Sequence, residues 1–394
     1  MKTQVAIIGA GPSGLILARL LSLQGIPSVI VERQTREYVE ARIRAGILEQ
    51  TAVDLLREAQ VVDNLDQHGL IHGGFSLAFN GRQERIDMNK FTGKNVIVYG
   101  QTELTKDLYD VVLSDDSITV IFNAENVEPV NYLEGHKPQV NFRHNDQQTT
   151  LDCDFIAGCD GYHGPSRASI PSGMIRNFER VYPFGWLGVL SETPPVDEEL
   201  IYANHERGFA LCSMRSLTRS RYYIQVRSDD KVDNWSDDAF WDELRRRLPK
   251  QNAEALITGA SIEKSIAATR SFVAEPMRFG QLFLAGDAAH IVPPTGAKGL
   301  NQAAADINYL SKAFIKFYKT GSTDLLDRYS EVALRRVWAS VRFSWWFTSL
   351  THNFNDDPIE HKIQLSELDY IFSSTAGQTV VAENYVGLPF ETFE

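Results

Sequence analysis

The stretch VAIIGAGPSGLILARLL, residues 5–21, decides the first part of the fold. Its apolar start predicts a buried strand over residues 4–8, and the apolar spacing after the glycines predicts a helix over residues 15–23. A second apolar run at residues 28–31 ends in Glu32. Strand, glycine-rich turn, helix, strand and acid follow one another in the order of a βαβ unit that binds a dinucleotide.

The glycine-rich turn, residues 9–14, has a physical explanation at each position. Gly9 permits the tight turn, Gly11 lets the backbone approach a pyrophosphate, and Gly14 lets helix and sheet pack closely. The helix N-terminus offers unpaired N–H groups and a positive dipole end to the phosphates. Glu32 is placed to accept a hydrogen bond from an adenosine ribose and to repel a 2′-phosphate. The unit therefore predicts that FAD or NAD binds here and that NADP does not. The alternative is a glycine turn that serves only for packing.

Composition narrows the class of protein. The chain has 394 residues, 43% of them hydrophobic and 23% charged, and a net charge of −12, which argues against nucleic acid or an anionic membrane as the main partner. No apolar run approaches the roughly 20 residues of a membrane span. The start of the chain enters a strand without a signal-peptide pattern, so we expect a cytoplasmic protein. The cysteines and histidines show no spacing typical of disulfides or a metal site.

Two more apolar runs end in acids. Asp160 follows the first within GCDG (158–161), and Asp287 follows the second within GDAAH (286–290). Because ligands of parallel sheets lie beyond the carboxyl ends of the strands, we expect these acids to converge with Glu32. FAD then fits better than NAD, because Asp287 can accept a hydrogen bond from a ribityl hydroxyl. Residues 296–301 can present backbone amides to the flavin, in a loop stiffened by the prolines at 293 and 294.

The rest of the chain divides between alternating and helical patterns. Alternation predicts a hairpin over residues 74–88 with an Asn-Gly turn and four further strands at 184–190, 199–204, 208–214 and 221–226. Residues 151–160 and 281–287 read as strands, 236–248 as a helix capped by Ser236, and the chain after residue 301 as helices. We predict an α/β (α+β) two-domain flavoprotein. It would have a Rossmann-like FAD-binding domain (1–72, 98–180 and 268–300), an inserted antiparallel β-sheet substrate domain (73–97 and 181–267) and a C-terminal helical region (301–394).

Several motifs resemble one enzyme family. The three motifs GAGPSG (9–14), GCDGYHG (158–164) and GDAAHIVPPTGAKGLN (286–301) are similar to those of the single-component, FAD-dependent aromatic hydroxylases. The resemblance extends over residues 1 to about 390 through the following segments: RIRAGILEQ (42–50), VYGQTEL (98–104), YPFGWLG (182–188), IYANHERGFALCSMRS (201–216) and AENYVGLP (382–389).

The resemblance implies an activity. NAD(P)H would reduce FAD, O2 would add to give a flavin hydroperoxide, and its terminal oxygen would attack a phenol ring. The implied reaction is conversion of 4-hydroxybenzoate, activated as the phenolate, to 3,4-dihydroxybenzoate in the degradation of aromatic compounds, by a homodimer. Three alternatives stay open: another hydroxylated benzoate as substrate, a flavin oxidase or dehydrogenase without oxygen transfer, and a binding protein that has lost its activity.

The resemblance also implies the substrate site. Its members would be Tyr202, Ser213, Arg215, Tyr223 and Pro294, with Arg215 on the carboxylate because an arginine fork suits a planar anion. Without the resemblance, Arg215 reads as a surface ion pair and the tyrosines as packed core. The implied catalytic residues are Tyr202, Tyr385, His72, Pro294 and Thr295, with a proton chain running from the substrate phenol through Tyr202 and Tyr385 to His72.

The resemblance also implies which residues contact the cofactors. For FAD they are Gly9, Gly11, Ser13, Gly14, Glu32, Arg42, Arg44, Gln101, Asp160, Asp287, Lys298, Leu300 and Asn301, with Lys298 adding positive potential beside the reduced flavin. For NADPH they are Arg33, Gln34, Tyr38, Arg42, Arg44, His163, Arg167 and Arg270. Between residues 33 and 44, four arginines oppose two glutamates, which favours NADPH over NADH. Met214, Gln302 and the segment with Arg36, Glu37 and Glu40 depart from the family pattern.

Overall fold

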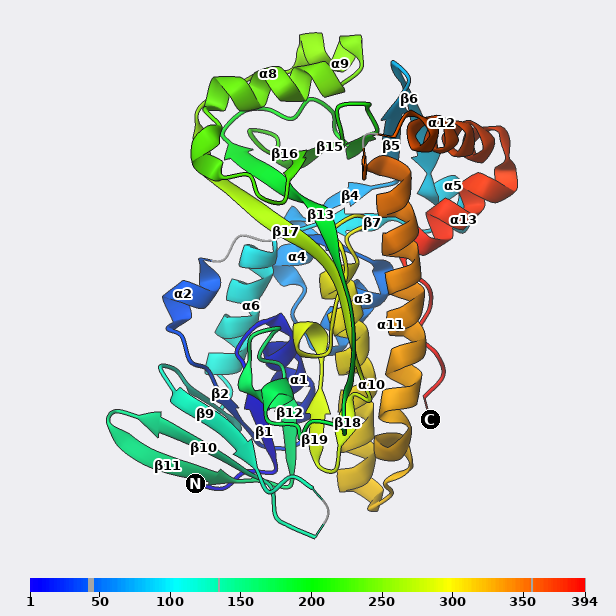
Figure 1. The fold of residues 1–394 in the computed structure, drawn as a ribbon. Coiled ribbons are helices and arrows are strands. Elements are labelled where there is room, and N and C mark those ends of the chain that lie inside the picture. Colours follow the sequence, from blue (N-terminus) through cyan, green and yellow to red (C-terminus); the bar gives the residue numbers. More distant parts are fainter. Residues whose placement is uncertain (42–45, 134, 356, 394) are drawn as a thin grey trace.

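The computed structural model describes residues 1–41, 46–133, 135–355 and 357–393 of the chain. Figure 1 shows two structural layers arranged end to end, one around β1 and β12 and the other around β15 and β16. The long strands β13 (Arg176–Ser191) and β17 (Ser261–Glu275) run from one layer to the other. The cavity described below lies where the two layers meet.

The first layer is a six-stranded sheet in the order β18-β19-β12-β1-β2-β8, parallel except for β18. Its strands are β1 (Val5–Ile8), β2 (Ser28–Val31), β8 (Ile118–Ile121), β12 (Phe155–Gly158), β18 (Arg278–Phe279) and β19 (Leu282–Leu284). Every residue of β1 and β2 is buried, as expected of central strands of a parallel sheet. Helix α1 (Pro12–Ser22) connects these two strands, which confirms the predicted βαβ unit.

The predicted strand over residues 151–160 is wrong in its extent, because two strands of different sheets share it. Residues 151 and 152 end β11 (Gln147–Asp152), which pairs with β10 (Gln139–His144) and β9 (Glu125–Val130) in a separate antiparallel sheet. The chain then turns, with the Cys153 amide donating to the Pro138 carbonyl, and continues as β12. Apolar residues alternate with Asp152 and Asp154 and then run on through Phe155, a pattern that fits one strand and does not reveal this change of sheet.

The second layer is an eight-stranded sheet in the order β20-β17-β13-β16-β15-β14-β5-β6. Its other strands are β5 (Gly74–Phe79), β6 (Arg82–Asp87), β14 (Ile201–Ala203), β15 (Ala210–Ser216), β16 (Arg219–Arg227) and β20 (His290–Ile291). Asn80 and Gly81 have φ of 49° and 75°, which is the left-handed geometry of the predicted hairpin turn. Strands β13 and β17 extend beyond residues 181 and 267, so they cross the predicted domain boundaries.

Helices and short elements complete the fold. The helix predicted after Ser236 is α8 (Asp237–Arg247), and the Ser236 side chain accepts a hydrogen bond from the Ala239 amide. The C-terminal helices are confirmed as α10 (Lys298–Thr320), α11 (Asp324–Thr351), α12 (Pro358–Ser373) and α13 (Thr375–Val386). The remaining elements are α2 (Arg36–Glu40), α3 (Gln50–Glu58), α4 (Asp63–His68), α5 (Met88–Thr92), α6 (Gln101–Leu113), α7 (Pro165–Ala168), α9 (Lys250–Ala255), η1 (Val232–Asn234), η2 (Gly286–Ala288), β3 (Ile47–Leu48), β4 (Leu70–His72) and β7 (Val96–Val98).

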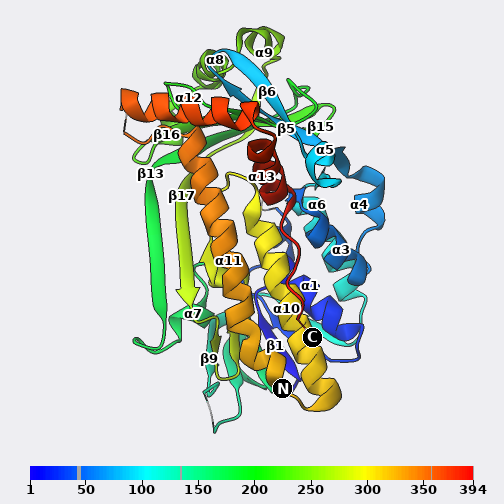
Figure 2. The ribbon, with the colours of Figure 1, turned by 90° about the vertical axis from the view of Figure 1, so that its right-hand side faces the viewer.

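Helices α10 and α11 form a long pair beside the first layer. Figure 2 shows α11 running up toward the second layer, where α12 and α13 follow it. Helix α11 therefore reaches from the first layer to the edge of the eight-stranded sheet. Within the described ranges, none of the helices is both long enough and apolar enough to span a membrane.

Candidate active site

A cavity of about 530 Å³ opens between the two layers. Loops at the carboxyl ends of β1, β2, β12 and β19 form one end, and strands β13 to β16 form the other. The residues that line it include most of the predicted site residues: Gly9, Gly11, Ser13, Glu32, Arg33, Gln34, Tyr38, Gln101, Asp160, Asp287, Pro294, Leu300, Tyr202, Ser213, Arg215 and Tyr223. The fold thus brings the predicted cofactor and substrate sites to one space.

The glycines of the first loop have the geometry that close approach requires. A Cβ on Gly9, where φ is 103°, would lie 2.5 Å from the Cys159 carbonyl oxygen, and one on Gly14 would lie 2.1 Å from the Gly9 carbonyl oxygen. A Cβ on Gly11 would meet nothing within 4 Å. Gly11 caps α1 without any side-chain hydrogen bond, so the first amides of this helix are available to an anion in the cavity.

Two of the strand-end acids are held in different ways. The Glu32 carboxylate is buried and accepts hydrogen bonds from the amides of Ala10 and Gln34, both at 2.8 Å. Asp160 accepts at Oδ2 from the Ser166 amide at 2.7 Å, while its buried Oδ1 has no partner within the described residues. Burial raises the pKa of Asp160 although the Ser166 hydrogen bonds lower it. An acceptor oxygen left over beside the cavity fits a hydroxyl-bearing cofactor such as FAD.

Asp287 is supported from behind by a buried ion pair that sequence reasoning missed. His290 Nε2 lies 2.5 Å from Asp306 Oδ2, which also accepts from the Gly286 amide at 2.8 Å. Burial alone would lower the pKa of His290, but the Asp306 carboxylate more than offsets it and raises that pKa. Gln302, which departs from the family pattern, donates to Asp306 at 3.2 Å. The loop that carries Asp287 is therefore anchored to α10.

Lys298 and Asn301 do not line the cavity. Lys298 is buried and donates to the Glu49 carboxylate and, at 3.0 Å, to the Tyr385 carbonyl. Arg336 donates to the other Glu49 oxygen at 3.2 Å. Burial lowers the pKa of Lys298 although Glu49 acts to raise it. Asn301 accepts from the Glu49 amide at 2.9 Å. The two residues hold the loop in place, and the predicted positive potential at the flavin would act through this paired lysine.

The substrate end of the cavity contains an arginine without an acidic partner. Ser213 and Arg215 on β15 line the cavity, whereas Met214 between them lines a different one, as alternation along a strand requires. Burial lowers the pKa of Arg215, and a hydrogen bond with Tyr223 acts to raise it. In the described parts of the chain, no carboxylate lies within ion-pair distance of Arg215, whereas neighbouring Arg221 pairs with Glu263 at 2.5 Å.

Two buried tyrosines meet at the same end. The hydroxyls of Tyr202 and Tyr385 lie 2.8 Å apart, although 183 positions separate them in the chain. Phe75 stacks on the Tyr385 ring with centroids 4.1 Å apart. Burial raises the pKa of Tyr202 to about 12, although hydrogen bonds with Tyr385 and the Gly296 backbone lower it. Tyr202 lines the cavity, and Tyr385 lies directly behind it.

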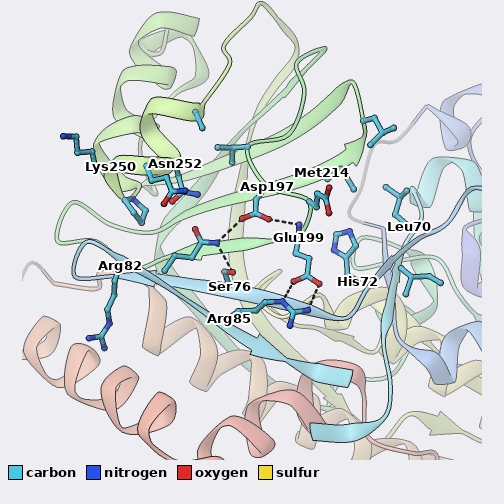
Figure 3. Close-up of a pocket in the computed structure, with 18 of the residues that line it drawn as sticks. Leu70, His72, Ser76, Arg82, Arg85, Asp197, Glu199, Met214, Lys250 and Asn252 are labelled. Carbon is cyan, nitrogen blue, oxygen red and sulfur yellow. Dashed lines mark hydrogen bonds and ion pairs between the residues drawn. The ribbon is translucent and has the colours of Figure 1, made fainter. Parts of the chain in front are cut away.

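His72 lies in a second cavity of about 1220 Å³, which Figure 3 shows with Met214 and Glu199 around it. Both ring nitrogens of His72 are buried and have no hydrogen-bond partner among the described residues. Glu199 forms two hydrogen bonds with Arg85, at 2.6 and 2.9 Å. Burial lowers the pKa of His72, and the nearby acids, Glu199 first, act to raise it. A link from Tyr385 to His72 therefore stays a prediction.

The predicted coenzyme residues fall into two groups. Arg33, Gln34 and Tyr38 line the outer part of the cavity, and Arg33 and Tyr38 are exposed. Arg36 instead pairs with Glu40 at 2.5 Å, so this arginine and this glutamate cancel in the charge count. Arg42 and Arg44 lie outside the described residues.

The second group does not line the cavity. Arg167 donates to the Ala288 carbonyl at 2.7 Å and lies over the Tyr162 ring at 4.6 Å. Arg270 pairs with Glu179 at 3.0 Å, and the His163 ring packs edge-on against Tyr162. These contacts place all three beside the Asp160 loop.

Sequence reasoning assigned no role to Trp186, which lines the cavity next to Tyr223. The segment YPFGWLG contains it, and an apolar ring inside a β-strand is usually read as core. No signal within the segment distinguishes a cavity wall from core.

The fold and the site together define a flavin-dependent enzyme: a dinucleotide turn and strand-end acids share one cavity with a polar pocket on the second sheet. That sheet was predicted to be antiparallel and is mixed, because β14 pairs with β5 in parallel. Comparison with known proteins gives the family. The chain belongs to the FAD binding domain family, whose profile matches residues 2–344. FAD is therefore its cofactor, and the predicted family is confirmed.

Relatives of known name agree with this assignment. The chain is 58% identical over 393 residues to a p-hydroxybenzoate hydroxylase of Acinetobacter baylyi, which covers 99% of this chain and 96% of the relative. It is 26% identical to a rifampicin monooxygenase of Rhodococcus hoagii, over 86% of this chain and 69% of the relative. The crystal structure of p-nitrophenol 4-monooxygenase from Pseudomonas putida has a TM-score of 0.81 at 17% identity, over 98% of this chain and 99% of the other. The structural likeness shows the shared fold.

Proposed function

We propose that this protein hydroxylates 4-hydroxybenzoate at ring carbon 3 to form 3,4-dihydroxybenzoate, with NADPH and O2 as co-substrates, in the degradation of aromatic compounds. One observation carries the proposal: the unpaired charge of Arg215 and the buried Tyr202 hydroxyl line one cavity with the flavin loops. A ring with a carboxylate at one end and a hydroxyl at the other finds a partner for each. The 58% identity to a p-hydroxybenzoate hydroxylase supports the same substrate.

The residues that would hold FAD are those at the strand ends. Glu32 would accept from the ribose, the first amides of α1 would bind the pyrophosphate, and Asp287 would accept from the ribityl chain. When bound, FAD takes electrons from the nicotinamide coenzyme and supplies the oxygen chemistry. The protein's own contribution is to bind, to orient and to exclude water.

Arg215 would orient the substrate. Its guanidinium offers two parallel N–H donors to a carboxylate, and the hydroxyls of Ser213 and Tyr223 line the same part of the cavity. Binding of a carboxylate would also give Arg215 a direct ionic partner, which no described acid within ion-pair distance supplies. The substrate hydroxyl would then point away from Arg215 and toward Tyr202, which lines the same end of the cavity.

Tyr202 and Tyr385 would move the phenol proton. Because burial keeps the pKa of Tyr202 near 12, this tyrosine stays protonated at neutral pH and cannot act as a permanent base. It can still pass a proton on, since each hydroxyl both donates and accepts. A phenolate is more electron-rich at its ortho carbon than a phenol, so removal of this proton activates the ring. The onward step to His72 is part of the proposal.

The coenzyme, the assembly state and the compartment are further parts of the proposal. Arg33 and Tyr38 at the outer cavity would bind the 2′-phosphate of NADPH, which leaves NADH as a weaker donor. Exposed apolar residues of α11 to α13, among them Trp345, Ile363 and Tyr370, support a homodimer of twice the 44.3 kDa chain mass. We place the enzyme in the cytoplasm.

The test is to incubate the FAD-loaded enzyme with NADPH and 4-hydroxybenzoate and to identify the product by chromatography. Formation of 3,4-dihydroxybenzoate in proportion to NADPH consumed would support the proposal. Hydrogen peroxide without hydroxylated product would instead indicate an oxidase. Product from 3-hydroxybenzoate but not from 4-hydroxybenzoate would indicate a different benzoate as substrate.

A further inference from the structure

Trp186 forms part of the cavity wall, and a single buried hydrogen bond holds its polar end. Its indole Nε1 donates to His352 Nε2 at 2.8 Å. Trp186 is 3% and His352 0% exposed, so water cannot replace either partner. On its other side, the Trp186 ring lies 5.2 Å from that of Tyr223, which belongs to the proposed carboxylate site.

The hydrogen bonds determine the tautomer of His352. An indole N–H only donates, so His352 Nε2 must accept and its proton must be on Nδ1. Nδ1 lies 2.9 Å from the Thr351 hydroxyl oxygen and 3.1 Å from the Thr348 carbonyl oxygen, and both can accept that proton. Burial lowers the pKa of His352 to about 3, so the ring stays neutral and remains an acceptor throughout the working pH range.

Packing fixes the His352 ring in place. It stacks on Phe209 and on Phe184, with ring centroids 4.1 and 4.7 Å apart and planes within 17° in both pairs. The end of α11 is also tied to the sheet, because Gln225 on β16 accepts from the Asn353 amide at 3.1 Å. The position of His352 is therefore set by the same strands that carry the substrate residues.

The same helix end also contacts the opposite wall. The Thr348 hydroxyl donates to the buried Thr295 hydroxyl at 2.9 Å. Thr295 follows Pro294, which lines the cavity on the flavin side. The last turn of α11 and its capping residue His352 thus join the flavin loop to the Trp186 wall.

We propose that His352 is a positioning residue for substrate binding. It acts through Trp186, whose indole it holds as a flat wall beside Tyr223, and Thr348 links this wall to the loop that carries Pro294. The inference rests on the proposed function only in taking 4-hydroxybenzoate as the probe. The Trp186 wall would contact the substrate before any reaction takes place. Substitution of His352 should therefore change substrate binding and leave turnover nearly unchanged.

The experiment is a double-mutant cycle on the FAD-loaded enzyme. His352→Phe keeps a flat ring for stacking but leaves the indole N–H buried without an acceptor, so KM for 4-hydroxybenzoate should rise about tenfold with kcat changed less than about twofold. Trp186→Phe removes the donor. The double variant should then match Trp186→Phe alone, because the two residues act as one unit. His352→Gln keeps an acceptor and should return KM most of the way to the parent value. This variant also tests the proposal if His352→Phe folds poorly.

Two controls sharpen the result. Trp241→Phe removes an indole whose Nε1 donates to the Gly259 carbonyl at 2.9 Å, away from the cavity, and should leave KM unchanged. The effect of His352→Phe should also be the same at pH values of about 6.5 and 8.5, because a histidine that is already neutral at both does not titrate between them.

Additive effects of the two substitutions on KM, or a folded His352→Phe enzyme with unchanged KM, would overturn the proposal. An enzyme that does not hydroxylate 4-hydroxybenzoate would contradict the proposed function, and tryptophan fluorescence then decides on His352 separately. The emission of Trp186 is the parent spectrum minus that of Trp186→Phe. The corresponding difference in the His352→Phe background is the His352→Phe spectrum minus that of the double variant. If the hydrogen bond holds the indole, this second difference spectrum should be shifted relative to the first. Two identical difference spectra would refute the role of the hydrogen bond.

Discussion

Arg215→Met is the most direct test of the substrate site. Methionine keeps most of the length and volume of the side chain and removes only the charge and the donors. Arg215 is half-buried, and no acid in the described chain lies within ion-pair distance of it, because nearby Glu263 pairs with Arg221. A bound carboxylate would be its ionic partner, so the variant would leave that carboxylate without a countercharge.

The magnitude follows from the groups that remain. Removing one partner of a buried charge pair costs about 2–5 kcal/mol. The hydroxyls of Ser213 and Tyr223 still line this end of the cavity and can donate to the carboxylate, so we expect the lower part of that range, about 2–3 kcal/mol. At 1.4 kcal/mol for each factor of ten, the Kd for 4-hydroxybenzoate should rise about 30- to 150-fold.

The assay measures Kd from the change in flavin absorbance on ligand addition, for 4-hydroxybenzoate and for 4-hydroxybenzamide. The amide carries no charge, so parent and variant should bind it within about threefold of each other. Arg219→Met is the matched control, because Arg219 lies on the same sheet but pairs with exposed Glu192. An unchanged Kd in Arg215→Met, or an equal loss for acid and amide, would refute the assignment of the carboxylate site.

Three further predictions use the rest of the cavity. Tyr202→Phe should keep substrate binding and flavin reduction but release hydrogen peroxide in place of product, with Tyr385→Phe milder; full coupling in Tyr202→Phe would remove the phenolate argument. Arg33→Ser should lower the ratio of kcat/KM for NADPH to that for NADH, because the 2′-phosphate loses its fork donor; an unchanged ratio would show that this segment does not read the phosphate. Asp306→Asn leaves the buried His290 without its countercharge and should destabilise the protein by about 3–5 kcal/mol in denaturant unfolding while weakening FAD binding; loss of neither would mean that the pair does not support the loop.

Local patterns carried much of the fold prediction. The glycines at 9, 11 and 14 predict their turn because neighbouring backbone leaves no room for a Cβ at the first and third. The Asn80-Gly81 hairpin and the Ser236 cap were predictable for the same reason, since a short segment determines its own geometry. The acids at the strand ends were predictable because parallel strands place their carboxyl ends together.

Partners that come from distant parts of the chain were not predictable in this way. Lys298 has a charge that reads as potential for the flavin, yet it pairs with Glu49, 249 positions away. Trp186 and His352 are 166 positions apart, and neither segment contains a sign of the other. A side chain's type shows what it can bind, but only the packed fold shows which partner reaches it.

Ion pairing divides the charged residues around this cavity into those that stabilise the structure and one that would bind a ligand. Lys298, His290 and Arg221 each have a carboxylate partner within the protein, so each is satisfied before any ligand arrives. A buried charge without a partner is costly and is retained only where something supplies the partner. Arg215 lines the inner cavity with no described acid within ion-pair distance, since Glu263, which acts on it from farther away, pairs with Arg221. A carboxylate that pairs directly with Arg215 would therefore come with the ligand. By the same reasoning, variants of the satisfied pairs should change stability first, whereas variants of Arg215 should change affinity for charged ligands and leave stability the same or higher.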